Sequence, residues 1–194
     1  MPGRLIYLMG PSGSGKDSLI DAARDSLLQM NCEVARRIIT RSEESMGEQA
    51  LGVSPEAFRR LREAGRFALS WHANGLDYGI PVEIDQWLGA GRNVLVNGSR
   101  GYLAEAQARF PKLLPVLLTV KAEVLRDRLQ RRNRESAEEI DSRLQRNSLF
   151  WVQASGGGAE GILRLDNSEA LGVTVERFLG LLRQEGLAGK LESV

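Results

Sequence analysis

The chain has 194 residues, of which 42% are hydrophobic and 26% are charged, and its formal net charge is +1. These values are typical of a folded globular domain, and the near-neutral charge does not favour nucleic acid as a partner. A single cysteine, Cys32, excludes an internal disulfide and a cysteine-based zinc site. The apolar runs are too short for a signal segment or a membrane span. We therefore expect a cytoplasmic protein that binds neither nucleic acid nor membrane.

Strands and helices are expected to alternate along the chain. In order, the first half is expected to hold a strand at 4–9, a helix at 16–30, a strand at 34–39, an irregular polar segment at 40–53, a helix from Ser54-Pro55 to Gly65, and a hairpin at 66–80 that turns at Asn74-Gly75. The second half is expected to hold helices at 81–90, 122–131, from Ser136 and at 168–184, and strands at 93–96, 114–120 and 162–165. This alternation predicts an α/β fold with a parallel sheet covered by helices on both faces.

A glycine-rich loop between the first strand and the first helix is the strongest functional signal. Its sequence is Gly10-Pro11-Ser12-Gly13-Ser14-Gly15-Lys16, which is the spacing of a Walker A loop. Glycines allow backbone N–H groups to converge on phosphate oxygens, and the helix N-terminus adds partial positive charge. Lys16 can reach the β- and γ-phosphates. We therefore expect nucleotide phosphates to bind along Gly10, Pro11, Ser12, Gly13, Ser14, Gly15, Lys16, Asp17 and Ser18.

Asp17 departs from the Walker A pattern, in which a Ser or Thr hydroxyl helps to hold Mg²⁺. Two interpretations are open. The carboxylate can hold Mg²⁺ directly or through water, or it can simply stabilise the first turn of the helix through the helix dipole.

Four segments together resemble the guanylate kinase-like branch of the P-loop nucleoside monophosphate kinases. They are GPSGSGKDSL at 10–19, Thr40-Arg41 with Gly47-Glu48, FALSWHANGLDYG at 67–79, and RLQRRNRESAEEIDSRL at 128–144. The resemblance implies a P-loop kinase fold with a five-stranded parallel sheet, ATP as donor and Mg²⁺. It also implies a single domain with a core (1–39, 91–126 and 144–194), an acceptor-binding insertion (40–90) and a lid (127–143).

Several departures from guanylate kinases concern the acceptor. Ser70 replaces the glutamate that reads guanine, and Ile80 follows Tyr-Gly where a Ser or Thr is usual. Glu44 stands at the second acceptor-phosphate arginine, and Asn97 stands where a core strand should end in an acidic residue. Without its carboxylate the site loses its means of selecting guanine, so GMP is not the expected acceptor.

The substituted pattern is similar to the family of ribose 1,5-bisphosphate phosphokinases. It combines a loop that ends Lys-Asp-Ser, the hairpin sequence SWHANGLDYG, and a strand that ends VNGSR. The resemblance implies ATP-dependent phosphorylation of ribose 1,5-bisphosphate at its 1-phosphate, which gives 5-phosphoribosyl 1-diphosphate in phosphonate catabolism. The alternatives are another small-molecule kinase, such as a nucleoside monophosphate kinase, or a non-catalytic guanylate kinase-like binding module. The intact Lys16 argues against the module.

Site roles follow from the same resemblance. Lys16 and the lid arginines Arg132 and Arg143 are expected to be catalytic, and the other five arginines of 126–146 to lie on the surface. The acceptor is expected to bind through Arg41, Ser70, His72, Tyr78, Asn97 and Arg100. A structural ion pair for Arg100, a core position for Tyr78 and a hairpin histidine without a task are the rival interpretations. The protein is expected to be a monomer or a homodimer.

Overall fold

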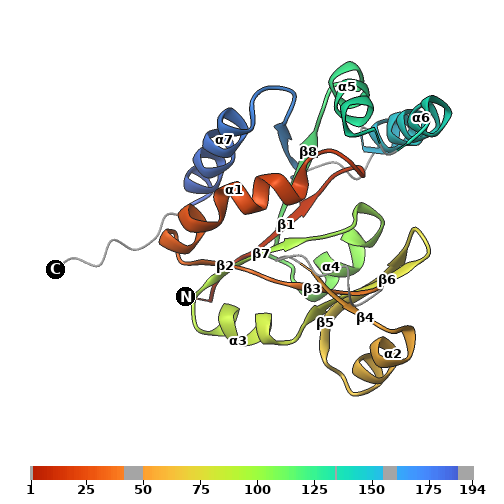
Figure 1. The fold of residues 1–194 in the computed structure, drawn as a ribbon. Helices are drawn as coiled ribbons and strands as arrows, with labels where there is room; N and C mark the ends of the chain where they lie inside the picture. The colour runs from red at the N-terminus through yellow and green to blue at the C-terminus, as the bar shows by residue number, and fades with distance from the viewer. Residues whose placement is uncertain (1, 42–49, 134, 155–160, 188–194) are drawn as a thin grey trace.

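The centre of the molecule is a five-stranded parallel sheet (Figure 1). The computed structural model describes residues 2–41, 50–133, 135–154 and 161–187, and of residues 132 and 149–154 it describes the backbone alone. The strands lie in the order β2 (Cys32–Val34), β7 (Asn93–Asn97), β1 (Leu5–Met9), β8 (Leu114–Thr119) and β9 (Leu163–Asp166). Every neighbouring pair is parallel. The predicted α/β fold is thus confirmed.

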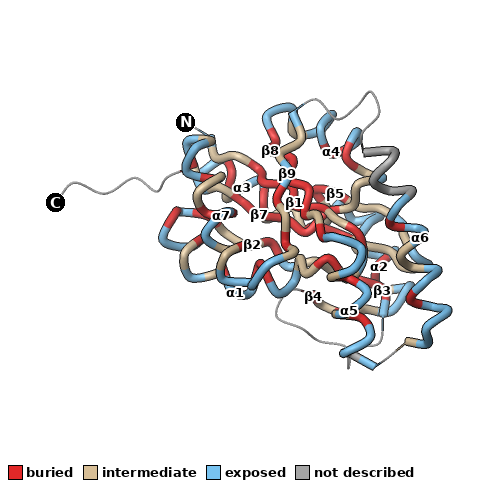
Figure 2. Tube along the Cα trace, turned by 90° about the horizontal axis from the view of Figure 1, so that it is seen from above, coloured by how far each residue is buried: buried red, intermediate tan, exposed pale blue. Residues whose placement is uncertain are grey.

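Helices cover both faces of this sheet. The helices α1 (Lys16–Gln29) and α7 (Leu171–Gln184) pack on one face, and α3 (Glu83–Gly89) and α4 (Leu103–Arg109) pack on the other. All five residues of β1 are buried, because a parallel strand in the middle of such a sheet meets side chains on both faces. Figure 2 shows these buried strands at the centre and exposed residues along the outer sides of the helices.

A second sheet of four strands stands beside the first. Its order is β4 (Ala50–Val53), β3 (Arg37–Thr40), β6 (Leu76–Pro81) and β5 (Phe67–Ala73). In Figure 1, α2 (Pro55–Glu63) lies beneath this small sheet, and α4 and the glycine loop lie above it. Phe67 fixes the lower face, because its ring lies against Gly79 and against the ring of Phe58 in α2, with the two ring centres 4.7 Å apart.

Three local signals are confirmed as the sequence predicts them. Ser54 caps α2, since its Oγ accepts a hydrogen bond of 3.1 Å from the Ala57 N–H. Asn74 and Gly75 both adopt positive φ, 53° and 75°, as a tight hairpin turn requires. Ser136 and Glu139 form a capping box with hydrogen bonds of 2.7 and 3.2 Å.

Two predictions about the elements are wrong, and two elements were missed. The single strand at 34–39 is two strands, β2 and β3, which belong to different sheets. The segment at 40–53 is not wholly irregular, because β4 pairs in parallel with β3 from Ala50 onward. The turn η1 (Arg100–Tyr102) and α4 were not predicted. Glu44, Gly47 and Glu48, which entered the family resemblance, lie outside the described residues.

The segment expected to act as a lid contains parts of two helices, α5 (Ala122–Arg132) and α6 (Ala137–Ala154). They share a separate apolar cluster of Val120, Leu125, Leu129 and Ile140. A side chain built at Gly13 would contact Leu125 and Leu129, so α5 lies directly against the glycine loop. In the described part of the chain, none of the helices is both long and apolar enough to cross a bilayer. The residue boundaries expected for core, insertion and lid stay predictions.

Candidate active site

The glycine loop between β1 and α1 adopts a conformation that only glycine takes easily. Gly13 has φ of +85° and Gly15 has φ of +94°, both in the left-handed region. At Gly10 a Cβ would come within 2.8 Å of the Leu118 carbonyl oxygen. The backbone is therefore shaped by its glycines, and it leads straight into the N-terminus of α1, where N–H groups can bind phosphate oxygens.

Asn167, which follows β9, holds the middle of this loop in place. Its Nδ2 donates to the Ser14 carbonyl oxygen at 2.8 Å, and its Oδ1 accepts from the Thr174 hydroxyl of α7 at 2.8 Å. Asn167 and Thr174 are both buried, so these bonds are shielded from water. The loop is thus tied to the core before any ligand binds.

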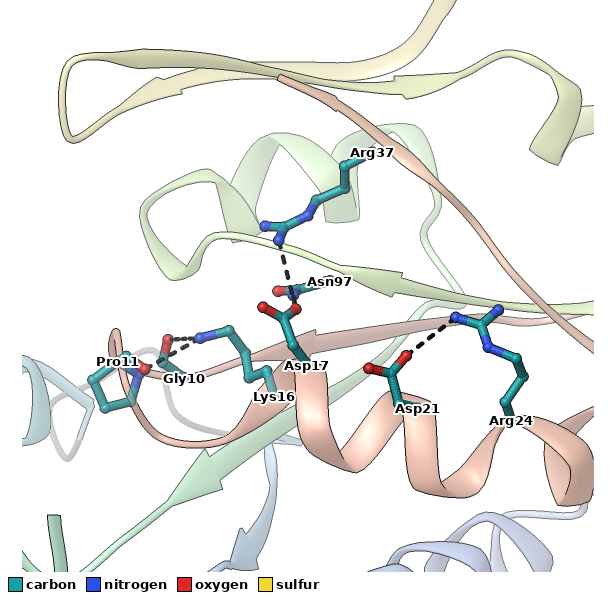
Figure 3. A network of polar contacts seen from close by, with 8 residues as sticks. All are labelled: Gly10, Pro11, Lys16, Asp17, Asp21, Arg24, Arg37 and Asn97. Atoms are coloured by element: carbon teal, nitrogen blue, oxygen red, sulfur yellow. Dashed lines mark hydrogen bonds and ion pairs between the residues drawn. The ribbon is translucent and has the colours of Figure 1, made fainter. Parts of the chain in front are cut away.

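Lys16 folds back over the loop that precedes it (Figure 3). Its Nζ donates to the carbonyl oxygens of Gly10, at 2.6 Å, and Pro11, at 3.2 Å. The pKa of Lys16 is lowered to about 8, chiefly by burial and then by the charge of Arg37, while the charge of Asp17 opposes both. A buried ammonium held by neutral carbonyls gains from an anion nearby, as a polyphosphate would provide.

Asp17, Asn97 and Arg37 meet just beyond Lys16 (Figure 3). Asn97, the last residue of β7, donates from Nδ2 to Asp17 Oδ1 at 2.9 Å. Arg37 reaches the same carboxylate from β3, with Nη2 3.7 Å from Oδ1. The three elements thus converge on one carboxylate at the start of α1.

The oxygen atoms of Asp17 and Asn97 suit a Mg²⁺ ion. Asn97 is 4% exposed, and its Oδ1 has no hydrogen-bond partner among the described residues. A buried amide oxygen of this kind is normally satisfied by a protein group, water or an ion. In the described part of the chain no three His, Cys, Asp or Glu side chains gather as a metal site. Mg²⁺ is usually held by one or two protein oxygens together with phosphates and water.

Arg143 is the lid arginine that the structure brings to the glycine loop. Its Nη1 donates to Ser12 Oγ at 2.7 Å, and its Nη2 makes an ion pair with Glu135. Arg132 is the last residue of α5, and its side chain lies outside the described part. Arg126, which lies in α5 just before the segment expected to act as a lid, pairs with Asp141 at the surface.

Tyr78, a predicted acceptor residue, lies on β6 next to Trp71 of β5. Its ring stacks on Trp71 with 5.5 Å between ring centres, and Trp71 stacks in turn on Tyr102 at 5.6 Å. The guanidinium of Arg37 lies 5.6 Å from the centre of the Tyr78 ring. The structure thus connects the predicted acceptor residue Tyr78 to the phosphate loop through Arg37 and Asp17.

Ser70 and His72 lie on the other face of the hairpin. Ser70 pairs with Gly79 and Trp71 pairs with Tyr78, so alternation places Ser70 and His72 opposite Trp71 and Tyr78. That is the face of Gly79, which is covered by Phe67 and α2. His72 is exposed and contacts Asp77 at 2.8 Å. The structure does not bring these two residues to the phosphate loop.

The two remaining predicted acceptor residues are arginines beyond the strand ends. Arg41 follows β3 and is exposed, and its charge is close enough to lower the pKa of Arg37. Arg100 begins η1, just beyond β7, and is half-buried. Burial lowers the pKa of Arg100, and so does the charge of Arg164 in β9. Both acceptor roles stay predictions.

Arg37 and Glu135 are parts of the site that sequence reasoning missed. Arg37 follows Arg36, and nothing in the residue types tells the two apart. Only the register of β3 sends Arg37 to Asp17, whereas Arg36 is exposed and donates to the Ala50 carbonyl. Glu135 lies eight residues before Arg143, so spacing does not mark it as a partner.

A glycine loop of this shape, at the carboxyl end of a parallel strand and under an arginine-bearing helix pair, defines the class of P-loop phosphotransferases. Solved structures agree on the fold. Guanylate kinase from Anaplasma phagocytophilum superposes with a TM-score of 0.69 at 20% identity, over 95% of this chain and 86% of that one. A gluconokinase from Sinorhizobium meliloti 1021 superposes with a TM-score of 0.53 at 20% identity, over 95% of this chain and 93% of that one.

Sequence relatives narrow the class. A protein of Pseudomonas fluorescens (strain SBW25) is 58% identical over 179 residues, 92% of this chain and 94% of its own length. A protein of Azotobacter vinelandii is 54% identical over 188 residues, which cover 97% of this chain and 100% of its own length. Both are named ribose 1,5-bisphosphate phosphokinase PhnN. No protein-family model matches the sequence. The chain belongs to the ribose 1,5-bisphosphate phosphokinase family, and it is a kinase.

Proposed function

We propose that the protein transfers the γ-phosphoryl group of ATP to the 1-phosphate of ribose 1,5-bisphosphate, giving 5-phosphoribosyl 1-diphosphate and ADP in phosphonate catabolism. The family relationship supports the substrate, since the relatives carry its name. The observation that carries the chemistry is Asn97, a neutral amide at the strand end beside the phosphate loop. An acceptor that arrives already ionised needs no general base there.

The reaction balances without a proton acceptor. A phosphate monoester is mostly dianionic at pH 7, because its second pKa is about 6. An oxygen of the 1-phosphate attacks the γ-phosphorus. The bond to the β–γ bridging oxygen breaks, and its electron pair leaves on ADP. Catalysis then consists of positioning and charge neutralisation.

Different residues of the chain bind ATP, contact the transferring phosphoryl group and hold Mg²⁺. Residues 10–18 bind the ATP phosphates, with Lys16 turning from its own loop carbonyls to the phosphate oxygens. Arg143 leaves Ser12 for the transferring group, and Arg132 joins it from the end of α5. Asp17 and Asn97 would hold Mg²⁺, which supplies charge neutralisation on the phosphates when bound. The predicted acceptor residues stay Arg41, Ser70, His72, Tyr78, Asn97 and Arg100.

A comparison of three acceptors tests this function. ADP release is measured with ribose 1,5-bisphosphate, GMP and gluconate in turn, at saturating ATP and Mg²⁺. We expect kcat/KM for ribose 1,5-bisphosphate to exceed the other two by about 10²-fold or more. A Lys16→Met variant prepared in parallel corrects for contaminating kinases. Equal or faster turnover of GMP or gluconate would contradict the proposal.

A further inference from the structure

Arg37 is a buried cation between the phosphate loop and the acceptor hairpin. Its side chain is 15% exposed, although it carries a full charge. It begins β3, which lies between β4 and β6 in the small sheet, and reaches down toward α1 (Figure 3). On one side it faces the carboxylate of Asp17, and on the other it lies over the Tyr78 ring.

The guanidinium group of Arg37 is incompletely bonded among the described residues. The Nη2 atom is 3.7 Å from Asp17 Oδ1, which is longer than a hydrogen bond. The Nε atom is buried and has no hydrogen-bond partner among the described residues. A buried charge held this loosely costs stability unless a ligand completes its bonds.

We propose that Arg37 binds the 1-phosphate of the acceptor, the group that attacks ATP, and so selects acceptors whose nucleophile is a phosphate. This inference rests on the proposed function. The position supports it, because Arg37 contacts Asp17, the neighbour of Lys16, and also contacts the acceptor hairpin at Tyr78. A phosphate group bound by Arg37 would therefore lie between the glycine loop, where ATP binds, and the hairpin that is predicted to hold the sugar.

The chemistry of the side chain fits a phosphate. A guanidinium offers a planar fork of N–H donors that can bind two phosphate oxygens at once. The Tyr78 ring lies near this guanidinium group, with its centre 5.6 Å from the central carbon, as in a cation–π contact. The positive charge also offsets the repulsion between a phosphate dianion and the ATP phosphates. Lysine would supply the charge without the fork.

Binding calorimetry with two sugar phosphates separates the 1-phosphate from the rest of the acceptor. Ribose 1,5-bisphosphate and ribose 5-phosphate are titrated into wild-type protein and into the Arg37→Lys and Arg37→Met variants. The ATP dissociation constant of each variant is measured as a check on the phosphate loop and on folding. Arg36→Met is the matched control, because Arg36 is the adjacent arginine and is exposed.

In Arg37→Met we expect the affinity for ribose 1,5-bisphosphate to fall by about 10²-fold, toward that of ribose 5-phosphate. The affinities for ribose 5-phosphate and ATP should change by less than about threefold. The affinity of Arg37→Lys for ribose 1,5-bisphosphate should lie between those of wild type and Arg37→Met. This second variant keeps the test valid if Arg37→Met fails to fold. Equal losses for both sugars, or for the sugars and ATP together, would overturn the inference. If the wild-type protein binds ribose 1,5-bisphosphate no better than GMP, the proposed function fails instead.

Discussion

We expect the charge of Lys16 to lower the free energy of unfolding of the ligand-free protein. Its pKa falls from 10.5 to about 8 in the folded protein, chiefly through burial. At about 1.4 kcal/mol for each pKa unit, this difference corresponds to about 3 kcal/mol of lost stability at pH 7. Replacing Lys16 with Met keeps the apolar stem but removes the charge. The loop carbonyls lose a donor, which offsets part of the gain and leaves about 2 kcal/mol.

The pH dependence gives this prediction its sign. Between pH 8 and 10.5 the unfolded chain binds more protons at this lysine than the folded chain does, so wild-type stability rises with pH through that window. The extra stability of Lys16→Met over wild type is therefore complete below pH 8 and lost by about pH 10.5. Urea unfolding of both proteins at pH 7 and at higher pH measures it. At pH 7 the melting temperature of the variant should be higher by about 4–8 °C. A variant that is less stable than wild type, by the same amount at every pH, would refute the reasoning.

Two further predictions concern the lid and the end of β7. Arg143→Ala should lower kcat by about 10³-fold, because Arg143 reaches the glycine loop, whereas the exposed Arg146→Ala should stay within about threefold of wild type. Steady-state kinetics decides this, and a loss below tenfold would remove Arg143 from the catalytic residues. Gly98→Ala places a Cβ 2.2 Å from the Tyr7 ring and should cost about 1–3 kcal/mol in thermal unfolding. The control Gly101→Ala meets only a contact of 3.8 Å, and equal costs for the two would contradict the steric explanation.

Short-range chemistry made much of this fold predictable. Ser54, Asn74-Gly75 and Ser136 act within four residues of themselves, so their caps and turns can be read from the sequence. The glycine loop belongs to the same group, because Gly13 and Gly15 are needed for the local backbone shape. These elements can therefore be predicted from the neighbouring residues alone.

Long-range pairing accounts for what the sequence did not indicate. The strand β4 has four residues, one of them Gly52, and it forms only because β3 lies beside it. The helix α4 buries just Leu103 and Ala106, too few for a clear apolar period. Arg37 and Arg36 are chemically identical, and the register of β3 alone separates them. The candidate site was therefore predictable at the phosphate loop and much less so at the acceptor side.

Phosphorus NMR of the complete reaction tests the account most directly. Wild-type protein is incubated with ATP, Mg²⁺ and ribose 1,5-bisphosphate, and Lys16→Met is run beside it. Coupled diphosphate resonances at the 1-position should replace the 1-phosphate signal, in equal amount to the ADP that forms, and only with wild type. An unchanged 1-phosphate signal while ATP is consumed, or a product that Lys16→Met makes equally fast, would contradict phosphoryl transfer to a phosphate at this loop.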